Sequence, residues 1–343
     1  MDKILEVQDL CTTFHTERGD LKAIEGVSFH VYKGEILGIV GESGCGKSVT
    51  SQSIMRLYNE KTTAGYQGQV LFEGTNLFDL TEKEMKKIRG DKIAMVFQDA
   101  LSALNPVFTV GKQIVETLQI HQKLDKKAAR EKAIEILRLV GIPAPERRID
   151  QYPHELSGGM RQRVMIAIAL ACNPRLLIAD EPTTALDVTI QAQIMELIVD
   201  LNKKLDMGVM LITHDLAVVA EVCSRVIVMY LGQIVEEADV NDLFDNPRHP
   251  YTLGLMKSIP RLDGDRSERL YMIKGMVPLL NQIPTGCRFA PRCQYATERC
   301  FQEMPQLMEV SATQKVRCFR AMEDGAVQKE CAMEEGGAAY EKQ

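Results

Sequence analysis

A short glycine-rich segment constrains this chain more than any other part of it. The apolar run at 36–40, ILGIV, predicts a buried strand, and the letters GESGCGKS follow it immediately. These letters fit the P-loop pattern, in which Gly41 and four further residues precede Gly46-Lys47-Ser48. Glycines allow backbone N–H groups to surround phosphate oxygens, because no Cβ stands in the way. The segment therefore predicts a phosphate-binding loop between a strand and a helix.

The residues of this loop have separate predicted roles. Lys47 would reach the β- and γ-phosphates of a nucleotide, and the Ser48 hydroxyl would be a ligand of Mg²⁺. The helix that begins near Gly46 would add the positive end of its dipole. Phe14, near a predicted turn, could stack on a purine ring or belong to the core. The candidate nucleotide-binding residues are Phe14, Gly41, Ser43, Gly44, Cys45, Gly46, Lys47, Ser48 and Val49.

Two later apolar runs end in residues that suit phosphoryl transfer. The run LLIAD at 176–180 is followed by Glu181, and the run VMLIT at 209–213 is followed by His214. Asp180 would hold the Mg²⁺ shell, and Glu181 would orient and deprotonate the attacking water. A histidine at the end of a central parallel strand lies at the ligand-binding edge of an open α/β sheet. The alternative for the two carboxylates is an acidic surface pair.

The letters LSGGMRQR at 156–163 predict a second anion site. Ser157 is a suitable helix N-cap, and the two glycines after it leave backbone N–H groups exposed where the helix starts. Taken alone, the same segment could be the capped start of a core helix.

The composition excludes some classes of protein. With 343 residues, 45% hydrophobic and 26% charged, the chain has the composition of a globular protein. A formal net charge of −6 argues against a general nucleic-acid-binding surface. The first ten residues lack the pattern of a signal peptide. The longest apolar run, at 164–172, is shorter than the ~20 residues that a spanning helix needs. A membrane role is therefore expected to come through partner subunits.

Together, these motifs resemble the nucleotide-binding subunit of an ABC transporter over about residues 1–240. GESGCGKS is similar to the Walker A motif, LSGGMRQR to the ABC signature, and LLIADE to the Walker B motif with its catalytic glutamate. Gln98 resembles the Q-loop glutamine, residues 185–187 the D-loop, and His214 the switch histidine.

The resemblance implies an α/β P-loop NTPase of the ABC type, with a mostly parallel core sheet, an antiparallel N-terminal sheet and a helical subdomain. It implies Gln98, Glu181 and His214 as catalytic residues. The Mg²⁺ shell would consist of Ser48, Gln98 and Asp180. Two such domains would pair head to tail, so that ATP on one P-loop is completed by the other domain. The residues acting across the dimer would be Ser157, Gly158, Gly159, Gln162 and Asp187.

Three further segments resemble the ATPases of dipeptide, oligopeptide and nickel permeases. They are the loop after Gln98 with LNP at 104–106, the letters NPRHPYTLGLMKSIP at 246–260, and GCRFAPRCQYATERC at 286–300. The expected function is therefore ATP hydrolysis that powers a bacterial importer of di- or oligopeptides. Import of nickel or another solute is the alternative, and an exporter ATPase or a non-transport ABC ATPase is a more distant one.

The same resemblance implies the partners of the chain. They would be a second ABC ATPase subunit, identical or homologous, two membrane permease subunits and an extracytoplasmic solute-binding protein, with no nucleic acid. The chain would then lie peripherally at the cytoplasmic face of the cell membrane.

Cysteines crowd the C-terminal part of the chain. Cys287, Cys293, Cys300 and Cys318 have the spacing C-x₅-C-x₆-C-x₁₇-C, and Cys331 follows in the acidic tail. Four thiolates suit a [4Fe–4S] cluster or a structural Zn²⁺. Free or disulfide-linked thiols are the third possibility. Similarity to peptide-permease ATPases implies the cluster.

Cys45 occupies a position where serine is common in the family. A thiol among phosphate-facing N–H groups at a helix start is expected to have a lowered pKa. Alkylation of Cys45 is therefore expected to block ATP binding.

The expected organisation is an ABC ATPase domain at 1–240, a small cysteine-bearing domain at 241–320 and a mobile acidic tail at 321–343. A single helix is expected over 114–139. A hairpin is expected around Leu231-Gly232.

Overall fold

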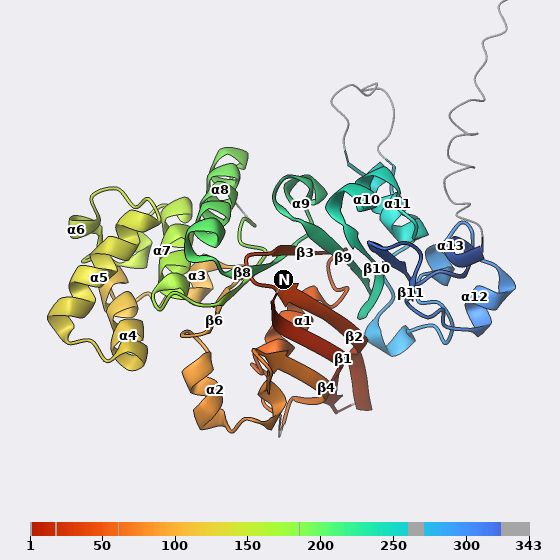
Figure 1. Ribbon diagram of the computed structural model, residues 1–343, viewed down its shortest axis with the longest axis horizontal. Helices are drawn as coiled ribbons and strands as arrows, with labels where there is room; N and C mark the ends of the chain where they lie inside the picture. Colours follow the sequence, from red (N-terminus) through yellow and green to blue (C-terminus); the bar gives the residue numbers. More distant parts are fainter. Residues whose placement is uncertain (1, 18, 61, 185, 260–270, 324–343) are drawn as a thin grey trace, which may run out of the picture.

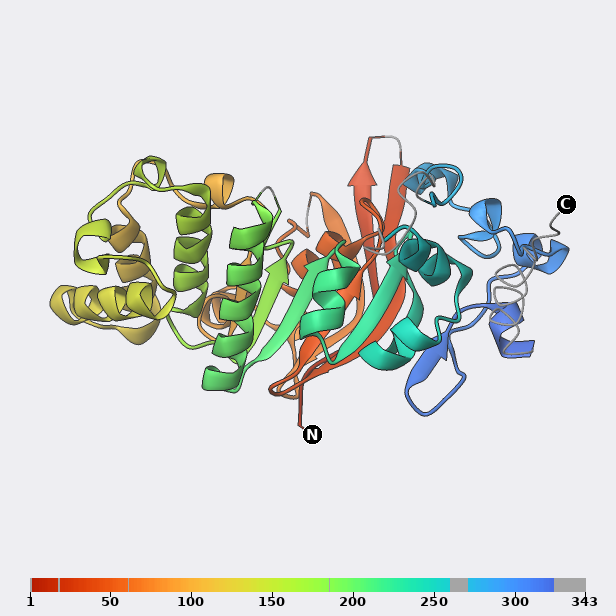
Figure 2. The same ribbon diagram turned by 90° about the horizontal axis from the view of Figure 1, so that it is seen from above.

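The computed structural model describes residues 2–17, 19–60, 62–184, 186–259 and 271–323. Along its longest axis, a group of helices lies at one end, two β-sheets lie in the middle, and the C-terminal region lies at the other end (Figures 1 and 2). None of the helices that the structure describes is both long enough and apolar enough to cross a bilayer.

The central sheet has eight strands and is parallel over five of them. Its order is β11-β12-β10-β9-β3-β8-β7-β6, and the run from β9 to β6 is parallel. The parallel strands are β9 Arg225–Tyr230, β3 Ile36–Val40, β8 Gly208–Thr213, β7 Leu176–Asp180 and β6 Ile93–Val96. Every residue of β3, β7 and β8 is buried, as expected for strands with both faces covered. The predicted mostly parallel core sheet is confirmed.

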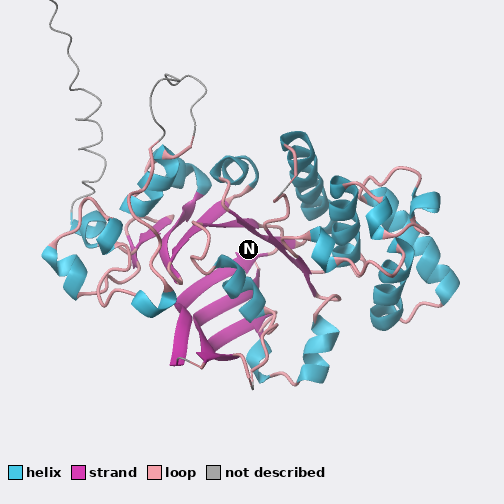
Figure 3. Cartoon of the chain, turned by 180° about the vertical axis from the view of Figure 1, so that it is seen from behind, coloured by secondary structure: helices cyan, strands magenta, loops and turns pink. Residues whose placement is uncertain are grey.

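A four-stranded antiparallel sheet comes mainly from the N-terminus (Figure 3). Its order is β2-β1-β4-β5, formed by β2 Gly19–Tyr32, β1 Lys3–Thr16, β4 Ala64–Phe72 and β5 Thr75–Asn76. In β2, alternate residues such as Val27 and Val31 are buried, while Ser28 is exposed. Helix α1, Lys47–Ile54, contacts β1, β2 and β7, and so lies between the two sheets.

The helical part at one end consists of α3 Ala100–Ala103, α4 Val110–Gln122, α5 Lys126–Leu139, α6 Pro145–Arg148 and α7 Gly158–Leu170 (Figure 1). Helix α2 Glu82–Ile88 precedes β6, α8 Val188–Leu205 follows β7, and α9 Leu216–Val222 follows β8 and contacts β3. The single helix predicted over 114–139 is wrong. Lys123 adopts a left-handed conformation with φ 54°, and the Asp125 side chain accepts a hydrogen bond from the Ala128 N–H at 2.8 Å. Asp125 therefore caps a new helix where a continuous one was expected.

The hairpin expected around Leu231-Gly232 is confirmed. Strand β9 is followed by β10, Gln233–Asp239, and the two strands pair antiparallel. Both turn residues have positive φ, 43° for Leu231 and 75° for Gly232, as a two-residue hairpin turn requires.

The C-terminal region continues the central sheet beyond β10. Strands β12, Gln314–Val316, and β11, Met308–Glu309, pair antiparallel at its edge. The carboxylate of Glu236 on β10 is fully buried and accepts hydrogen bonds from the N–H groups of Arg248 and His249 and from the Gln314 amide, at 2.7–2.9 Å. Helices α10 Val240–Asp245, α11 Pro250–Lys257, α12 Glu298–Gln302 and α13 Phe319–Glu323 complete the region. Most of the predicted acidic tail, 324–343, lies outside the described residues.

Candidate functional site

The glycine-rich loop joins β3 to α1, as predicted. Gly41 has φ 152°, and a Cβ there would collide with the carbonyl oxygen of Met229, so only glycine fits. The buried Lys47 side chain turns back over the loop. Its Nζ donates hydrogen bonds to the carbonyl oxygens of Gly41 at 2.7 Å and Glu42 at 3.1 Å. The ammonium group thus stands at the entrance of the loop, where phosphate oxygens are expected to bind.

Two predicted Mg²⁺ ligands meet at the start of α1. The Ser48 hydroxyl donates a hydrogen bond to the Asp180 carboxylate at 2.9 Å, although 132 residues separate them. Asp180 ends β7 and is buried, and this burial raises the pKa of its carboxyl group. Oxygen ligands of this kind suit Mg²⁺, which also keeps water and phosphate oxygens in its shell.

The predicted catalytic residues lie together at the carboxyl ends of neighbouring strands. The Gln98 Nε2 donates to Glu181 Oε2 at 2.7 Å, and His214 Nδ1 lies 3.5 Å from Glu181 Oε1. Gln98 follows β6, Glu181 follows β7 and His214 follows β8, which are adjacent in the sheet. Glu181 has φ 47°, an uncommon conformation for a residue with a side chain, and such strain is typical of functional sites.

These three side chains line one cavity of about 640 Å³ together with the P-loop and the C-terminal region. The lining residues are Glu42, Ser43, Gln98, Glu181, His214, Gly275, Met276, Val277 and Arg292. Sequence reasoning missed Thr184, whose hydroxyl donates to Glu181 Oε2 at 2.9 Å. The sequence signal that could have indicated it was a threonine three residues after Glu181. Gln98 was also predicted as a Mg²⁺ ligand. Its amide nitrogen donates a hydrogen bond to Glu181, and no hydrogen bond joins it to the predicted ligands Asp180 and Ser48 among those described.

The other nucleotide-binding predictions occupy the loop and its surroundings. Ser43 and Gly44 are exposed, and Val49 packs against the core beneath the antiparallel sheet. Phe14, in β1, is half-buried and lies edge-on to Tyr58 with ring centroids 4.9 Å apart. Stacking of Phe14 on a purine stays a prediction.

The lowered pKa expected for Cys45 is wrong. The Cys45 side chain is fully buried among core residues, and burial raises the pKa of its thiol despite the nearby Lys47. The residue's backbone belongs to the loop, but its Cβ points into the core. The expected reactivity of Cys45 towards alkylating reagents therefore has no basis in the fold.

The signature residues begin α7 and line a different cavity. The Ser157 hydroxyl accepts a hydrogen bond from the Met160 N–H, and the buried Gln162 side chain donates to the Pro182 carbonyl. Gly158 and Gln162 line a cavity of about 360 Å³ with Gln98. Gly159 packs on Ile190 at the start of α8.

The D-loop residue Asp187 caps α8, because its carboxylate accepts the Ile190 N–H at 2.9 Å. Of the other two D-loop residues, Leu186 lines the cavity that holds Gly158 and Gln162, whereas Ala185 lies outside the described residues.

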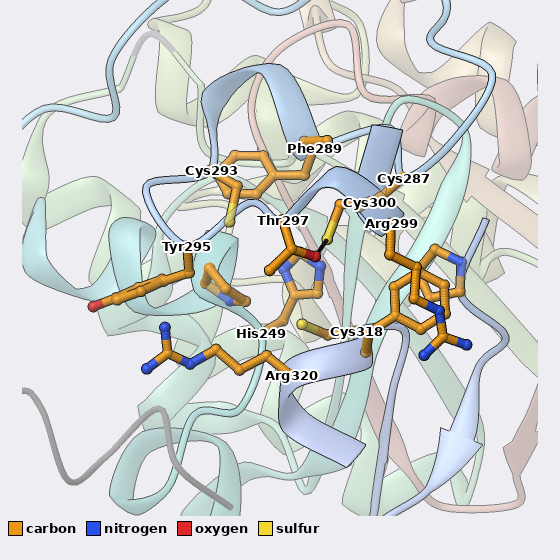
Figure 4. A pocket seen from close by; sticks show the side chains of 14 residues that line it. His249, Cys287, Phe289, Cys293, Tyr295, Thr297, Arg299, Cys300, Cys318 and Arg320 are labelled. Atoms are coloured by element: carbon orange, nitrogen blue, oxygen red, sulfur yellow. Dashed lines mark hydrogen bonds between the residues drawn. The ribbon is translucent and has the colours of Figure 1, made fainter. Parts of the chain in front are cut away.

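The four clustered cysteines share a cavity of about 440 Å³ (Figure 4). The Cys287 N–H donates to the Cys300 carbonyl at 2.8 Å, and the sulfurs of Cys293, Cys300 and Cys318 point into the cavity. Burial raises the pKa of Cys287 to about 11 and that of Cys293 to about 12. The described cysteines are free thiols. Among the described residues, no three His, Cys, Asp or Glu side chains are placed to hold one metal ion.

Comparison with known proteins identifies the family. The model of the ABC transporter family matches residues 24–184, and the model of the oligopeptide/dipeptide transporter C-terminal region matches residues 235–300. The chain is 56% identical over 322 residues to a probable peptide ABC transporter ATP-binding protein of Sinorhizobium fredii, covering 94% of this chain and 96% of that one. It is 55% identical over 317 residues to the oligopeptide transport ATP-binding protein OppD of Bacillus subtilis, covering 92% and 88%. The chain belongs to the ABC transporter ATP-binding proteins.

Solved ABC cassettes share its fold. The dimeric post-hydrolysis state of the ATP-binding cassette MJ0796, bound to ADP and Pi, superposes with a TM-score of 0.62 and 31% identity, covering 69% of this chain and 98% of that one. CbiO1 of Clostridium perfringens gives a TM-score of 0.61 with 29% identity, covering 71% and 92%. The chain is therefore an ABC-type ATPase, for which ATP and Mg²⁺ are the expected ligands. The predicted ABC fold is confirmed for the cassette.

Proposed function

We propose that this ABC ATPase powers the import of di- or oligopeptides in bacteria. Peptide specificity is supported by relatives named for peptide, oligopeptide and dipeptide transport at 51–56% identity. It is also supported by the match of residues 235–300 to the C-terminal region of oligopeptide/dipeptide transporters. The single observation that carries the ATPase role is the meeting of Ser48 with Asp180, and of Gln98 and His214 with Glu181, at adjacent strand ends.

In the proposed reaction, the P-loop holds the ATP phosphates through its backbone N–H groups and Lys47. Mg²⁺ held by Ser48 and Asp180 would neutralise charge on the β- and γ-phosphates. Glu181 orients the attacking water and accepts its proton, and Gln98 and Thr184 hold its carboxylate in place. His214, with 63% of its side chain exposed, is free to approach the γ-phosphate. Catalysis then depends on positioning and on charge neutralisation.

A complete site requires a second ATPase subunit. In one chain the signature residues Ser157, Gly158 and Gly159 start α7, and Gly158 lines a different cavity from Glu42 and Ser43 of the P-loop. Solved relatives are described as dimeric cassettes. A head-to-tail pair would bring Ser157, Gly158, Gly159, Gln162 and Asp187 of one subunit to the nucleotide of the other. ATP would close this pair, and hydrolysis would reopen it.

The remaining partners follow from the proposed transport function. Two permease subunits would form the pathway, and an extracytoplasmic binding protein would deliver the peptide. The ATPase would then sit at the cytoplasmic face of the membrane.

We also propose a [4Fe–4S] cluster in the cysteine cavity. The four thiols line one cavity of about 440 Å³, and four thiolates could bind either a [4Fe–4S] cluster or a Zn²⁺ ion. The resemblance to peptide-permease ATPases favours the cluster. Bound there, it would cross-link the segments that carry Cys287, Cys293, Cys300 and Cys318.

Transport tests the main proposal. The gene for this chain would be deleted in its host. Uptake of a labelled dipeptide and of nickel would then be compared between the deletion strain and the same strain complemented with the gene. Complementation should restore peptide uptake, and Glu181→Gln should not. Restored nickel uptake without peptide uptake would contradict the peptide assignment.

Metal analysis tests the cluster. Full-length protein purified without oxygen should contain iron and acid-labile sulfide and should lose both in Cys318→Ser. Cys172→Ser, which removes a cysteine from the core of the helical part, is the matched control and should keep them. Stoichiometric zinc without iron would refute the cluster.

A further inference from the structure

An arginine stands next to each clustered cysteine. The pairs are Cys287-Arg288, Arg292-Cys293, Arg299-Cys300 and Arg317-Cys318. Three of these arginines extend to the ATPase cassette. Arg288 contacts Glu25 and the Leu231 carbonyl, Arg292 contacts Glu42, and Arg317 donates to the Ile234 carbonyl. Hydrogen bonds of these three arginines thus connect the cysteine-bearing segments to the cassette.

The Arg292 contact differs from the others because it reaches the P-loop itself. Glu42 is the residue directly after Gly41. Arg292 Nη1 donates to Glu42 Oε2 at 2.6 Å, and Arg292 Nη2 donates to Glu42 Oε1 at 3.0 Å. The guanidinium is only 4% exposed, and it also donates to the Lys274 carbonyl at 3.1 Å. A two-point charged pair of this kind fixes orientation as well as distance.

A second residue of the C-terminal region holds the backbone of Glu42. The Glu42 N–H donates to the Tyr251 hydroxyl at 2.7 Å. Tyr251 is fully buried on α11, and its ring packs against Tyr230 at 4.8 Å and Phe289 at 5.3 Å. Both the side chain and the backbone of Glu42 are therefore held from outside the cassette's sequence.

Glu42 also contacts Lys47, the phosphate-binding lysine of the loop. Lys47 Nζ donates to the carbonyl oxygens of Gly41 and Glu42. A rotation of the peptide at Glu42 would therefore move both the lysine and the neighbouring N–H groups that face the phosphates. Arg292 and Tyr251, more than 200 residues further along the chain, thus contact the residue whose carbonyl accepts from Lys47.

We propose that Arg292 is a positioning residue for nucleotide binding that acts through Glu42. The inference rests on the ATPase role of the chain and holds whatever solute is transported. P-loop contacts to the phosphates are present in both the ground state and the transition state. Their loss should therefore raise KM and leave kcat almost unchanged.

The test measures ATP binding and hydrolysis by the full-length chain. The variants are Arg292→Ala, Arg292→Lys, Glu42→Gln and the Arg292→Ala/Glu42→Gln double. We expect each of Arg292→Ala and Glu42→Gln to raise the Kd and KM for ATP about tenfold, with kcat within about twofold of the parent. Arg292→Ala removes the contact, and Glu42→Gln keeps one acceptor oxygen but loses the charge and the two-point geometry. The double variant should be no worse than Arg292→Ala, because the pair is already broken there. Arg292→Lys keeps the charge without the two-point geometry and should recover only part of the affinity.

Arg317→Ala is the matched control. Arg317 also neighbours a cysteine and attaches the same region to the cassette, but through the Ile234 carbonyl; it donates as well to the Pro305 carbonyl within the C-terminal region. It should lower thermal stability and leave the Kd for ATP within about twofold.

Three results would overturn the proposal. An equal rise in Kd for Arg317→Ala would mean that any loosening of the region has this effect. A rise for Arg292→Ala with none for Glu42→Gln would mean that Arg292 contacts the nucleotide directly, since it lines the same cavity as Glu181 and His214. An unchanged Kd for ATP in both Arg292→Lys and Glu42→Gln would show that the Arg292–Glu42 contact does not affect nucleotide binding, even if Arg292→Ala fails to fold. Failure of the unsubstituted chain to bind ATP would instead refute its assignment as an ATPase.

Discussion

Replacing Glu181 by glutamine should abolish turnover while leaving ATP binding intact. Gln98 donates to the carboxylate at 2.7 Å and Thr184 at 2.9 Å, and His214 Nδ1 lies 3.5 Å from it. Glutamine has the same size and can still offer its amide oxygen to Gln98, so the side chain should keep its place. It cannot accept a proton from water. General-base catalysis contributes about 10²–10⁴-fold, so kcat should fall by about 100-fold or more, which is at least ~2.7 kcal/mol of barrier.

The assay is steady-state phosphate release, combined with equilibrium binding of ATP. The P-loop contacts of Lys47 and the Ser48–Asp180 pair do not involve Glu181, so the Kd for ATP should not rise. The closed, ATP-bound pair of subunits should accumulate. Glu196→Gln, at an exposed position on α8, makes the same chemical change and should leave kcat unaltered. Turnover within about threefold of the parent in Glu181→Gln would refute the assignment of Glu181 as the base.

Three other outcomes are expected. Gly232→Ala should cost ~2 kcal/mol or more of folding stability, because the added Cβ would overlap the Ala23 carbonyl. Gly74→Ala has a similar φ but open space around the added Cβ, and should cost only ~1 kcal/mol. Equal melting temperatures of the two variants would contradict this expectation. Cys45 should not react with maleimide in the folded chain at pH 7 and should react after unfolding in urea. Its thiol is buried and has a raised pKa, so it becomes a thiolate only at a higher pH than a free cysteine does. Rapid labelling of the folded chain, measured by mass spectrometry, would be inconsistent with this burial. Ser48→Ala should weaken ATP binding about tenfold with Mg²⁺ and little in EDTA; an equal loss in both titrations would exclude a metal-ligand role.

The catalytic constellation was predictable because parallel strands end at one edge of a sheet. Once the runs before Lys47, Glu181 and His214 are recognised as parallel buried strands, their following residues must lie near one another. The structure brings together Gln98, Glu181 and His214 for this reason, and also Ser48 and Asp180. Strand order explains why these residues meet, whereas the ABC fold and the role of Gln98 were predicted from the resemblance of the motifs to a known family.

Other features left weaker signals in the sequence. The direction of the Cys45 side chain depends on how a loop of glycines turns, and residue type alone does not give it. The break between α4 and α5 was signalled by Asp125 as a helix cap, but the charged segment around it looked like one solvated helix. The contact of Arg292 with Glu42 joins residues 250 positions apart, and no periodicity marks such a pair. The division into domains at 240 stays a prediction.

The buried carboxylate of Glu236 makes the two halves of the chain interdependent. It lies on β10, and it accepts hydrogen bonds from Arg248, His249 and Gln314, which all come later in the chain. Ending the chain after residue 240 would leave this carboxylate without these donors and would expose the edge of β10 to other chains. We therefore expect that the segments after β10 cannot be exchanged freely among related ATPases, because they complete the central sheet and the hydrogen bonds of Glu236.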